Sequence, residues 1–298
     1  MKSYFVFALL VLLVSGCSGV SDLANSEQTD TTETAVPPSS EVEGSEAALF
    51  SAFFGLDDDI PALAGRMVCS GAAGADGMPV VFSEELDTAT LQAGDFRVTT
   101  ADGSIGEILC VTPAPAFDSG ELRTILMIGQ FGSADNQPAT VEIVGNLLSS
   151  DQSTNFRGTS VAVTPLEDGP FLVFAEVVPE SQWELGKESS RLPFGGGDGC
   201  PEATQQVVRA VWAGGVTKPG GDEVDDLERA AYKVYVESGS GEVEPVTPFA
   251  IGDLGDGDNN HELCLDTTAT PVRVEFPAGL LTDPRDDVNP ATSIDVTR

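Results

Sequence analysis

The stretch from Pro138 to Thr164, PATVEIVGNLLSSDQSTNFRGTSVAVT, returns near the end of the chain as PVRVEFPAGLLTDPRDDVNPATSIDVT, from Pro271 to Thr297. The two segments align at a constant offset of 133 residues without a gap, and 9 of their 27 positions are identical. Chance alone gives about two identities in a segment of this length at average composition. This agreement indicates that part of the chain was duplicated.

The repeat continues upstream of these segments with small gaps. Phe96-Arg97-Val98 corresponds to Tyr232-Lys233-Val234, and EILCVTP at 107–113 corresponds to EVEPVTP at 242–248. A unit of roughly 100 residues is too long for a solenoid repeat. The pattern therefore predicts a tandem duplication of a whole domain.

Each copy contains short segments in which apolar and polar residues alternate. Examples are TVEIV and SVAVT in the first copy, and VRVEF and SIDVT in the second. Alternation with period 2, bounded by Gly, Pro, Asp and Asn, is typical of half-buried strands, and no helical pattern separates these segments. We therefore predict an all-β chain with two tandem β-sandwiches, the first over residues 62–167 and the second over residues 168–298.

A motif in the first copy supports this fold. Residues 80–103 read VVFSEELDTATLQAGDFRVTTADG, and the positions that carry the motif are Phe82, Ser83, Glu84, Leu86, Asp87, Asp95, Phe96 and Val98. The segment is similar to the opening of the bacterial Ig-like domains typified by the S-layer protein SbsA. The second copy departs from that pattern, because it has Trp212-Ala213-Gly214-Gly215 where the first has Phe-Ser-Glu-Glu. The resemblance implies two Ig-like domains that form a non-catalytic extracytoplasmic module.

The first 17 residues, MKSYFVFALLVLLVSGC, have the features of an export signal. Lys2 supplies a positive charge, and residues 4–14 form an apolar run that is too short to span a bilayer, which takes about 20 residues. Leu13-Val14-Ser15-Gly16-Cys17 resembles the lipobox of bacterial lipoproteins, which implies removal of residues 1–16 and acylation of Cys17. The alternative is an ordinary signal peptide with an incidental cysteine. Ser18 at the next position implies sorting to the outer membrane, if the cell has two membranes.

Two further segments precede the first predicted domain. Residues 17–46 are rich in Ser, Thr and Glu, so they cannot bury enough apolar surface to offset the entropy of ordering, and we expect a disordered tether. Residues 47–61 carry four large apolar side chains at helical spacing, Leu49, Phe50, Phe53 and Phe54. This spacing predicts a short helix that acts as a lid on the first domain. The alternative is an exposed apolar patch for a partner.

The charge balance limits the class of partner. The chain has 14 Lys and Arg against 48 Asp and Glu, a formal net charge of 14 − 48 = −34, which becomes −35 when residues 1–16 with Lys2 are removed. This charge excludes electrostatic affinity for nucleic acid or for anionic lipid surfaces. The predicted contact with the membrane therefore goes through the lipid anchor. A surface this acidic stays hydrated at high salt and by itself points to no partner.

The sequence offers little for catalysis. It contains no GxSxG, HExxH, phosphate-loop or dinucleotide-binding motif, and its one histidine, His261, is expected to be a solvated loop residue. The predicted function is a membrane-anchored, non-catalytic binding, adhesive or structural module of the bacterial cell envelope, with a surface protein or glycan as its partner. The alternative is an extracytoplasmic glycan hydrolase that uses paired carboxylates. With 48 acidic residues, however, some pair lies close together by chance.

Four cysteines remain after Cys17, and each predicted domain holds two of them. An even number in an exported chain indicates disulfides, and four cysteines allow three connectivities. Pairing within domains predicts Cys69–Cys110 and Cys200–Cys264, each of which contributes roughly 4 kcal/mol in the chain-entropy model. A metal site made from these cysteines is disfavoured, because no CxxC spacing is present.

The acidic stretch DLGDGDNNHE at 253–262 suits a hard cation. Calcium prefers six to eight oxygen ligands, which Asp, Asn and backbone carbonyls at alternate positions supply. The stretch is not an EF-hand loop, because position 6 is His261 and position 12 is Thr267. The corresponding loop of the first copy, 117–121, is less charged, and the alternative is an acidic hairpin loop without a metal. Any bound metal is expected to be calcium held in the second domain. The expected ligands are Asp253, Asp256, Asp258, Asn260 and Glu262, with Asp222, Asp225 and Asp226 as further candidates from outside the loop.

Overall fold

The computed structural model describes residues 46–63, 68–189 and 196–298, and this part of the chain is nearly all β. The predicted signal peptide, Cys17 and all of the predicted tether except Glu46 lie outside the described residues. Within the described ranges, no helix combines the length and the apolar character needed to cross a membrane.

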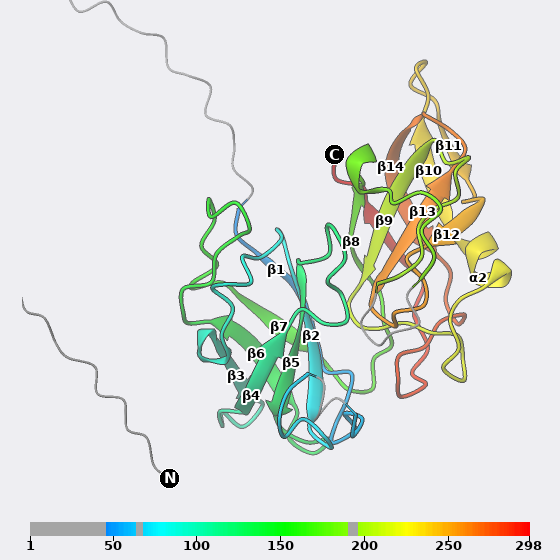
Figure 1. The fold of residues 1–298 in the computed structure, drawn as a ribbon. Coiled ribbons are helices and arrows are strands. Elements are labelled where there is room, and N and C mark those ends of the chain that lie inside the picture. The colour runs from blue at the N-terminus through cyan, green and yellow to red at the C-terminus, as the bar shows by residue number, and fades with distance from the viewer. Residues whose placement is uncertain (1–45, 64–67, 190–195) are drawn as a thin grey trace, which may run out of the picture. The chain divides into compact units, whose positions relative to one another are not determined.

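The first sandwich is built from seven strands (Figure 1). One layer has the order β1-β2-β5-β4 and the other has the order β3-β6-β7; β1 also pairs in parallel with β7 and so joins the two layers. A short 3-10 helix at Ala93–Asp95 leads into β3. The strands are β1 (Leu49–Phe53), β2 (Asp76–Phe82), β3 (Phe96–Thr100), β4 (Glu107–Thr112), β5 (Thr124–Gln130), β6 (Pro138–Ile143) and β7 (Ser160–Thr164).

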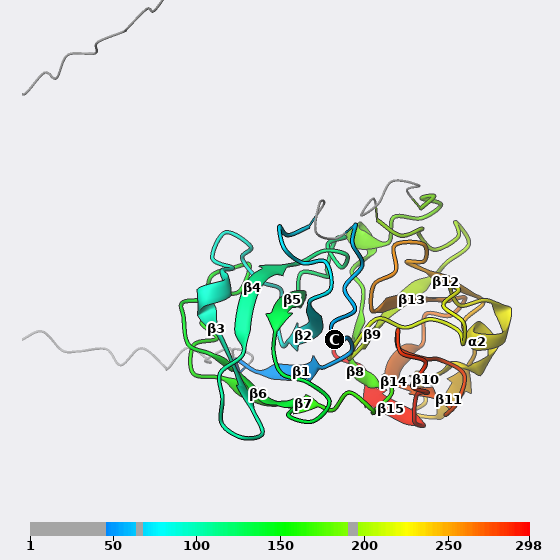
Figure 2. The same cartoon turned by 90° about the horizontal axis from the view of Figure 1, so that it is seen from below.

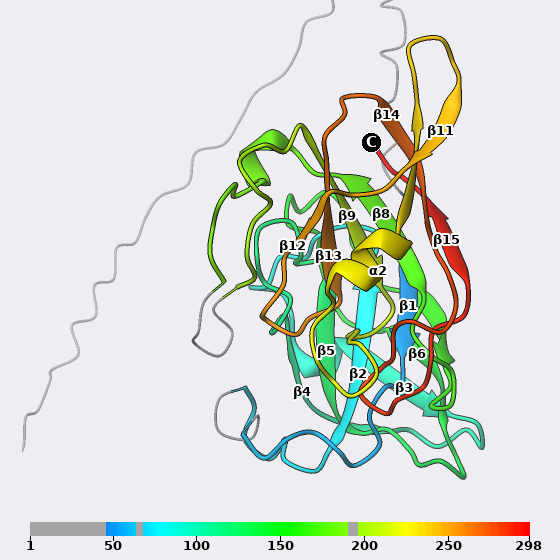
Figure 3. The same cartoon turned by 90° about the vertical axis from the view of Figure 1, so that its right-hand side faces the viewer.

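The second sandwich consists of two four-stranded sheets, seen on opposite sides of it in Figure 2. The sheet orders are β12-β13-β9-β8 and β11-β10-β14-β15. The helix α2 (Asp226–Ala231) leads into β10 (Figure 3), and the side chain of Asp225 caps its first turn. The strands are β8 (Leu172–Val177), β9 (Gln206–Trp212), β10 (Lys233–Glu237), β11 (Val243–Val246), β12 (Ala250–Gly252), β13 (Asn260–Leu265), β14 (Thr270–Phe276) and β15 (Thr292–Asp295). A 3-10 turn at Glu180–Gln182 lies between β8 and β9.

Seven strands of each sandwich share one topology, as expected for a duplicated domain, and the second sandwich adds β11 at the edge beside β10. Strands β1, β2, β5 and β4 pair in the same order as β8, β9, β13 and β12, and β3-β6-β7 corresponds to β10-β14-β15. The parallel contact between β1 and β7 recurs as a bridge between Glu176 and Thr297. This is the pairing of an immunoglobulin constant-type sandwich, in which strands ABED face strands CFG. The predicted all-β fold with two sandwiches is confirmed.

Aromatic side chains fill both cores. In the first sandwich, the Phe82 ring contacts the rings of Phe96 and Phe156 edge to face. In the second, Trp212 contacts Phe276 edge to face with the ring centroids 5.4 Å apart. Full burial of each large apolar side chain contributes about 1.5–3 kcal/mol. These cores therefore account for the alternating segments that the sequence displays.

The predicted helix at residues 47–61 is wrong, because Leu49–Phe53 forms β1 in the middle of the first sandwich's sheet arrangement. Leu49 belongs to the first core, whereas the Phe50 ring stacks on Phe174 of the second sandwich with the centroids 5.5 Å apart. Both faces of β1 carry large apolar side chains, although Phe50 is 38% exposed. A short apolar run of this kind cannot be told from a helix by periodicity. The first sandwich therefore begins at β1, before the predicted boundary at residue 62.

Candidate metal centre

Four carboxylates from the two repeats converge where the sandwiches meet. Asp118 and Glu121 lie in the loop between β4 and β5, and Asp253 and Asp256 lie in the corresponding loop between β12 and β13. One carboxylate oxygen from each of the four residues lies within 4.8 Å of the others. Glu121 is 1% exposed and Asp253 is 5% exposed, so the cluster is largely withdrawn from water.

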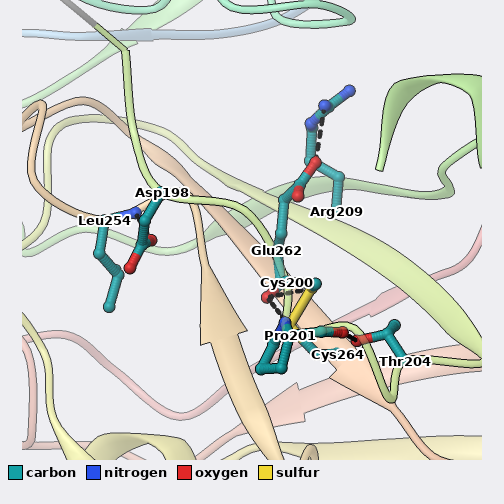
Figure 4. Close-up of a disulfide and its surroundings, with 8 residues drawn as sticks. All are labelled: Asp198, Cys200, Pro201, Thr204, Arg209, Leu254, Glu262 and Cys264. Atoms are coloured by element: carbon teal, nitrogen blue, oxygen red, sulfur yellow. Dashed lines mark hydrogen bonds and ion pairs between the residues drawn. A yellow bond between two sulfur atoms is a disulfide. The ribbon is translucent and has the colours of Figure 1, made fainter. Parts of the chain in front are cut away.

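The second loop turns sharply so that its carboxylates point inward. Asp253 has a φ of 65°, and Gly255 and Gly257 have positive φ values that favour glycine. Asp198 holds the start of the turn, because its Oδ1 accepts a hydrogen bond of 2.9 Å from Leu254 N (Figure 4). Its carbonyl also accepts one of 2.6 Å from Asp253 N. The backbone of this loop is therefore braced from a neighbouring segment.

The four carboxylates differ in how well they are paired. Asp118 Oδ2 accepts hydrogen bonds from Lys187 Nζ at 2.9 Å and from Gly197 N at 3.0 Å, and Glu121 Oε2 accepts one from Asp118 N at 2.9 Å. By contrast, Asp253 Oδ2 and Asp256 Oδ2 are buried and have no hydrogen-bond partner among the described residues. Burying a carboxylate oxygen without a partner is costly.

Burial and mutual repulsion raise the pKa values of Glu121, Asp253 and Asp256. The pKa of Glu121 is raised to about 7, mainly by burial, although Arg209 lowers it. Burial raises the pKa of Asp256 to about 6. The pKa values of Asp253 and Asp258 are also raised, first by burial and then by the neighbouring carboxylates. Unless a cation lies beside them, these buried carboxyl groups therefore favour their protonated forms.

Beside the cluster, a row of three charged side chains crosses three strands of the second sandwich. Arg209 on β9 is in register with Glu176 on β8 and with Glu262 on β13. Its Nη1 lies 3.2 Å from Glu176 Oε1, and its Nη2 lies 3.0 Å from Glu262 Oε1 (Figure 4). Burial raises the pKa of Glu262 to about 7 even though Arg209 opposes the shift. The arginine is 1% exposed, so this row is a buried ion-pair network.

The first sandwich covers this row. Arg209 Nη2 donates a hydrogen bond of 2.8 Å to the carbonyl of Ser119. Arg123 Nη2 reaches across to Glu176 Oε2 at 3.1 Å, and its guanidinium lies 4.0 Å from the centroid of the Phe174 ring. These contacts fix the two repeats against each other at the point where the acidic loops meet.

The structure brings together only part of the predicted ligand set. Asp253 and Asp256 converge, whereas Asp258 Oδ1 accepts a hydrogen bond of 2.8 Å from Asn260 N, and its Oδ2 accepts one from the side chain of Asn260. Glu262 pairs with Arg209 instead. Calcium at this loop stays a prediction.

The further candidates around α2 serve that helix and its surroundings. Asp225 accepts from Leu227 N as the N-cap and pairs with Lys218 at 2.8 Å, and Asp226 pairs with Arg229 at 3.0 Å. Neither joins the cluster at the junction, and nor does the exposed Asp222. Asp225 and Asp226 are therefore explained by helix capping and surface pairing.

The expectation that His261 is a solvated loop residue is wrong. His261 lies on β13 and is 2% exposed. Its Nδ1 lies 2.7 Å from the hydroxyl of Tyr232, which also accepts a hydrogen bond of 2.9 Å from Trp212 Nε1. Burial lowers the pKa of the imidazole to about 4. The loop ends earlier than its acidic sequence suggests, because β13 begins at Asn260.

Both cysteine pairs are joined as disulfides within their sandwiches. Cys69 is bonded to Cys110, and Cys200 is bonded to Cys264, which the yellow bond in Figure 4 marks. Cys264 lies on β13 two residues after Glu262, so the second disulfide holds the strand that carries the charged row. Cys17 lies outside the described residues.

Asp118, Glu121 and Arg209 are the residues of the site that the sequence reasoning missed. Asp118 and Glu121 occupy the loop that the internal repeat aligns with 253–262, but the repeat alone does not show that the two loops meet. Arg209 interrupts the apolar run VVRAVW at 207–212. A charge inside a buried strand indicates a buried partner.

The space enclosed by these groups decides what chemistry they can perform. The cavity lined by Glu121, Asp253, Glu262 and Arg209 has a volume of about 10 Å³. A volume of about 10–15 Å³ holds a single water molecule, so there is room for one water or one metal ion and none for a sugar ring. A larger hollow of about 500 Å³ on the second sandwich is lined by one carboxylate, that of Glu275.

Comparisons with known proteins reveal a weak likeness to solved structures of a bacterial S-layer protein. No protein-family model matches the chain, and no curated protein matches it. The chain is similar to the N-terminal part of the bacterial S-layer protein SbsC, with a TM-score of 0.26 and 11% identity over 85% of this chain and 44% of that one. A fragment of that S-layer protein spanning 31–844 gives a TM-score of 0.28 and 12% identity over 85% and 41%. The chain thus spans less than half of either structure, and a likeness at this level defines neither fold nor function.

Proposed function

We propose that this chain is a lipid-anchored protein of the bacterial cell envelope whose two sandwiches act together as a non-catalytic structural or binding module. The observation that carries the proposal is the junction between the repeats. Arg209 and Glu176 form buried or half-buried ion pairs there, and loops of the first sandwich cover them. Two domains joined by such contacts behave as one rigid unit, as a spacer or display surface requires.

The same junction argues against the alternative hydrolase. A glycosidase needs two carboxylates about 5–10 Å apart on either side of an open sugar-binding site. Here the convergent carboxylates lie within 4.8 Å of one another around a cavity of about 10 Å³. Burial raises the pKa of Glu121 to about 7, but the cavity beside it has no room for the sugar that a general acid would protonate.

The disulfides support an extracytoplasmic location. Cys69–Cys110 and Cys200–Cys264 are both formed, and structural disulfides persist in oxidising compartments. The lipobox-like Leu13-Val14-Ser15-Gly16-Cys17 supports the membrane anchor. Two or three acyl chains on Cys17 suffice for stable attachment, since each buried methylene contributes about 0.8 kcal/mol.

Fractionation of cells that produce the full-length chain tests the anchor. The wild type should enter the detergent phase and incorporate labelled palmitate, and Cys17→Ser should do neither. Ser18→Ala keeps the cysteine and is the matched control for acylation. Detergent partitioning of Cys17→Ser equal to the wild type would overturn the lipid anchor.

A hydrolysis assay tests the non-catalytic assignment separately. The purified chain, incubated with a panel of cell-wall and extracellular polysaccharides, should release no reducing ends above a buffer blank. Release that Glu121→Gln abolishes would instead assign catalysis to the junction and overturn the module.

A further inference from the structure

The strongest unexplained feature of the molecule is a pair of buried carboxylate oxygens at the junction. Asp253 is 5% exposed, and its Oδ2 has no hydrogen-bond partner among the described residues; the same holds for Asp256 Oδ2. Asp253 also lines the cavity of about 10 Å³. A native fold seldom leaves such atoms unpaired unless something else binds them.

The charged groups around the cavity indicate that the partner of the two unpaired oxygens is a cation. The four clustered carboxylates bring oxygens from both repeats to one place. The cations next to the cluster are already engaged: Lys187 contacts Asp118 and Glu184, and Arg209 contacts Glu176 and Glu262. Of the four clustered carboxylates, only Asp118 is paired with one of these cations, and two buried oxygens, Asp253 Oδ2 and Asp256 Oδ2, remain free as ligands for a cation.

We propose that one calcium ion binds at this junction, held by two carboxylates from each repeat. The ligands are Asp118, Glu121, Asp253 and Asp256. Carboxylates spaced within 4.8 Å match two oxygens on one ion with bonds of about 2.3–2.6 Å. Bidentate carboxylates, backbone carbonyls and water complete the six to eight oxygens that calcium takes. This inference goes beyond the proposed function and does not depend on the lipid anchor.

Calcium fits this ligand set better than magnesium does. Magnesium demands near-ideal octahedral geometry and keeps several of its waters. The cavity has no room for a hydrated ion, whereas four carboxylates can replace most of the water around calcium. Zinc prefers nitrogen and sulfur ligands, and none is present among the four residues.

A second group of acidic residues in the described part of the chain has no buried carboxylate oxygen without a hydrogen-bond partner. Asp57, Asp58 and Asp76 also bring three carboxylates together. Here, however, the buried Asp76 is satisfied, since its Oδ1 accepts from Asp58 N at 2.9 Å and its Oδ2 from Phe131 N at 2.5 Å. This group therefore provides a control for calcium binding to acidic clusters in general.

Because each repeat supplies ligands, the ion links the two sandwiches directly. Removing a ligand from either repeat should have the same consequence. A site in the second loop alone, by contrast, would be insensitive to Glu121. The experiment must therefore measure whether Glu121 of the first repeat contributes to calcium binding.

The test uses the full-length chain purified in detergent and stripped with EGTA. Isothermal titration with calcium chloride measures stoichiometry and affinity, and thermal unfolding is followed with and without calcium at constant ionic strength. The variants are Glu121→Gln from the first repeat and Asp253→Asn from the second. Asp57→Asn, in the second acidic group, is the control.

The wild type should bind one calcium ion per chain, and calcium should raise its melting temperature by roughly 5 °C or more. Both Glu121→Gln and Asp253→Asn should weaken binding at least tenfold, while Asp57→Asn changes neither quantity. In EGTA, both variants should melt at or above the wild type, because each removes repulsion between carboxylates. A variant that binds calcium weakly but melts in EGTA at or above the wild-type temperature has lost a ligand without damage to its fold.

Three results would overturn the proposal. Absence of calcium binding, with equal melting in calcium and EGTA, would mean that the carboxylates share protons and bind no metal. Full binding by Glu121→Gln would confine the ion to the second repeat. Loss of binding in Asp57→Asn would move the site to the other acidic group.

Discussion

The carboxylates of Glu121 and Asp253 lie within 4.8 Å of each other, although 253 − 121 = 132 residues separate them in the chain. Each residue belongs to the loop that leads into the corresponding strand of its repeat, β5 or β13. The duplicated domains therefore face each other through equivalent acidic loops. The unpaired oxygens thus lie in the second repeat, and two of the carboxylates that converge on them lie in the first.

The Arg209→Met substitution should destabilise the protein strongly. It leaves the carboxylate of Glu262, which is 5% exposed, without its ion pair, and breaking a buried pair costs about 3–5 kcal/mol. Urea unfolding measures the loss. Arg97→Met removes the exposed pair with Glu142 and should cost less than about 1 kcal/mol. Equal effects for both variants would contradict a buried network.

The Gly120→Ala substitution should loosen the same interface from the opposite side. Gly120 has a φ of 90°, and a Cβ there would come within 2.1 Å of Arg209 Nη1. Gly103 has a φ of 88° with nothing near its Cβ position, so Gly103→Ala isolates the backbone strain. We expect Gly120→Ala to cost about 1–3 kcal/mol more than Gly103→Ala in chemical denaturation. Closely similar losses would show that Arg209 does not pack against the loop.

The two disulfides should be recovered by non-reducing peptide mapping as Cys69–Cys110 and Cys200–Cys264. The double variant Cys200→Ala, Cys264→Ala should lower the free energy of unfolding by about 4 kcal/mol, because it frees a separation of 64 residues in the unfolded chain. Chemical denaturation measures this loss. A Cys110–Cys200 peptide would mean that the disulfides join the two sandwiches, contrary to the observed fold.

The single histidine provides a direct test of burial by NMR titration. His261 has a pKa lowered to about 4, because burial disfavours the imidazolium. The unfolded chain takes up this proton near pH 6.5, so the histidine contributes stability above that pH. The contribution is lost as the pH falls towards 4. A histidine resonance that titrates near pH 6.5 would place His261 in solvent and contradict the Tyr232–His261 contact.

Much of the fold could be predicted from the sequence, because most strands are buried on one face. Segments such as 138–143 and 270–276 alternate visibly, and the repeat supplied the second sandwich once the first was recognised. β1 could not be assigned in this way. Its Leu49 packs into one core while Phe50 packs on the other sandwich, which removes the period-2 signal.

The sequence indicated only those residues of the site that lie in the acidic loop of the second repeat. Asp253 and Asp256 stand out because they are close together in an acidic loop. Asp118 and Glu121 do not, because their role depends on the distance between two loops that no spacing in the chain reports. Glu262 appeared to belong to the acidic loop, but its position on β13 directs it to Arg209.

The most direct measurement is a crystal structure of the chain grown with calcium, with anomalous scattering recorded at long wavelength. The account predicts one anomalous peak between the repeats, about 2.3–2.6 Å from carboxylate oxygens of Asp118, Glu121, Asp253 and Asp256. A peak bonded only to residues of the second repeat would contradict the interdomain site. A junction without a peak, with Glu121 and Asp253 sharing a proton, would contradict calcium binding altogether.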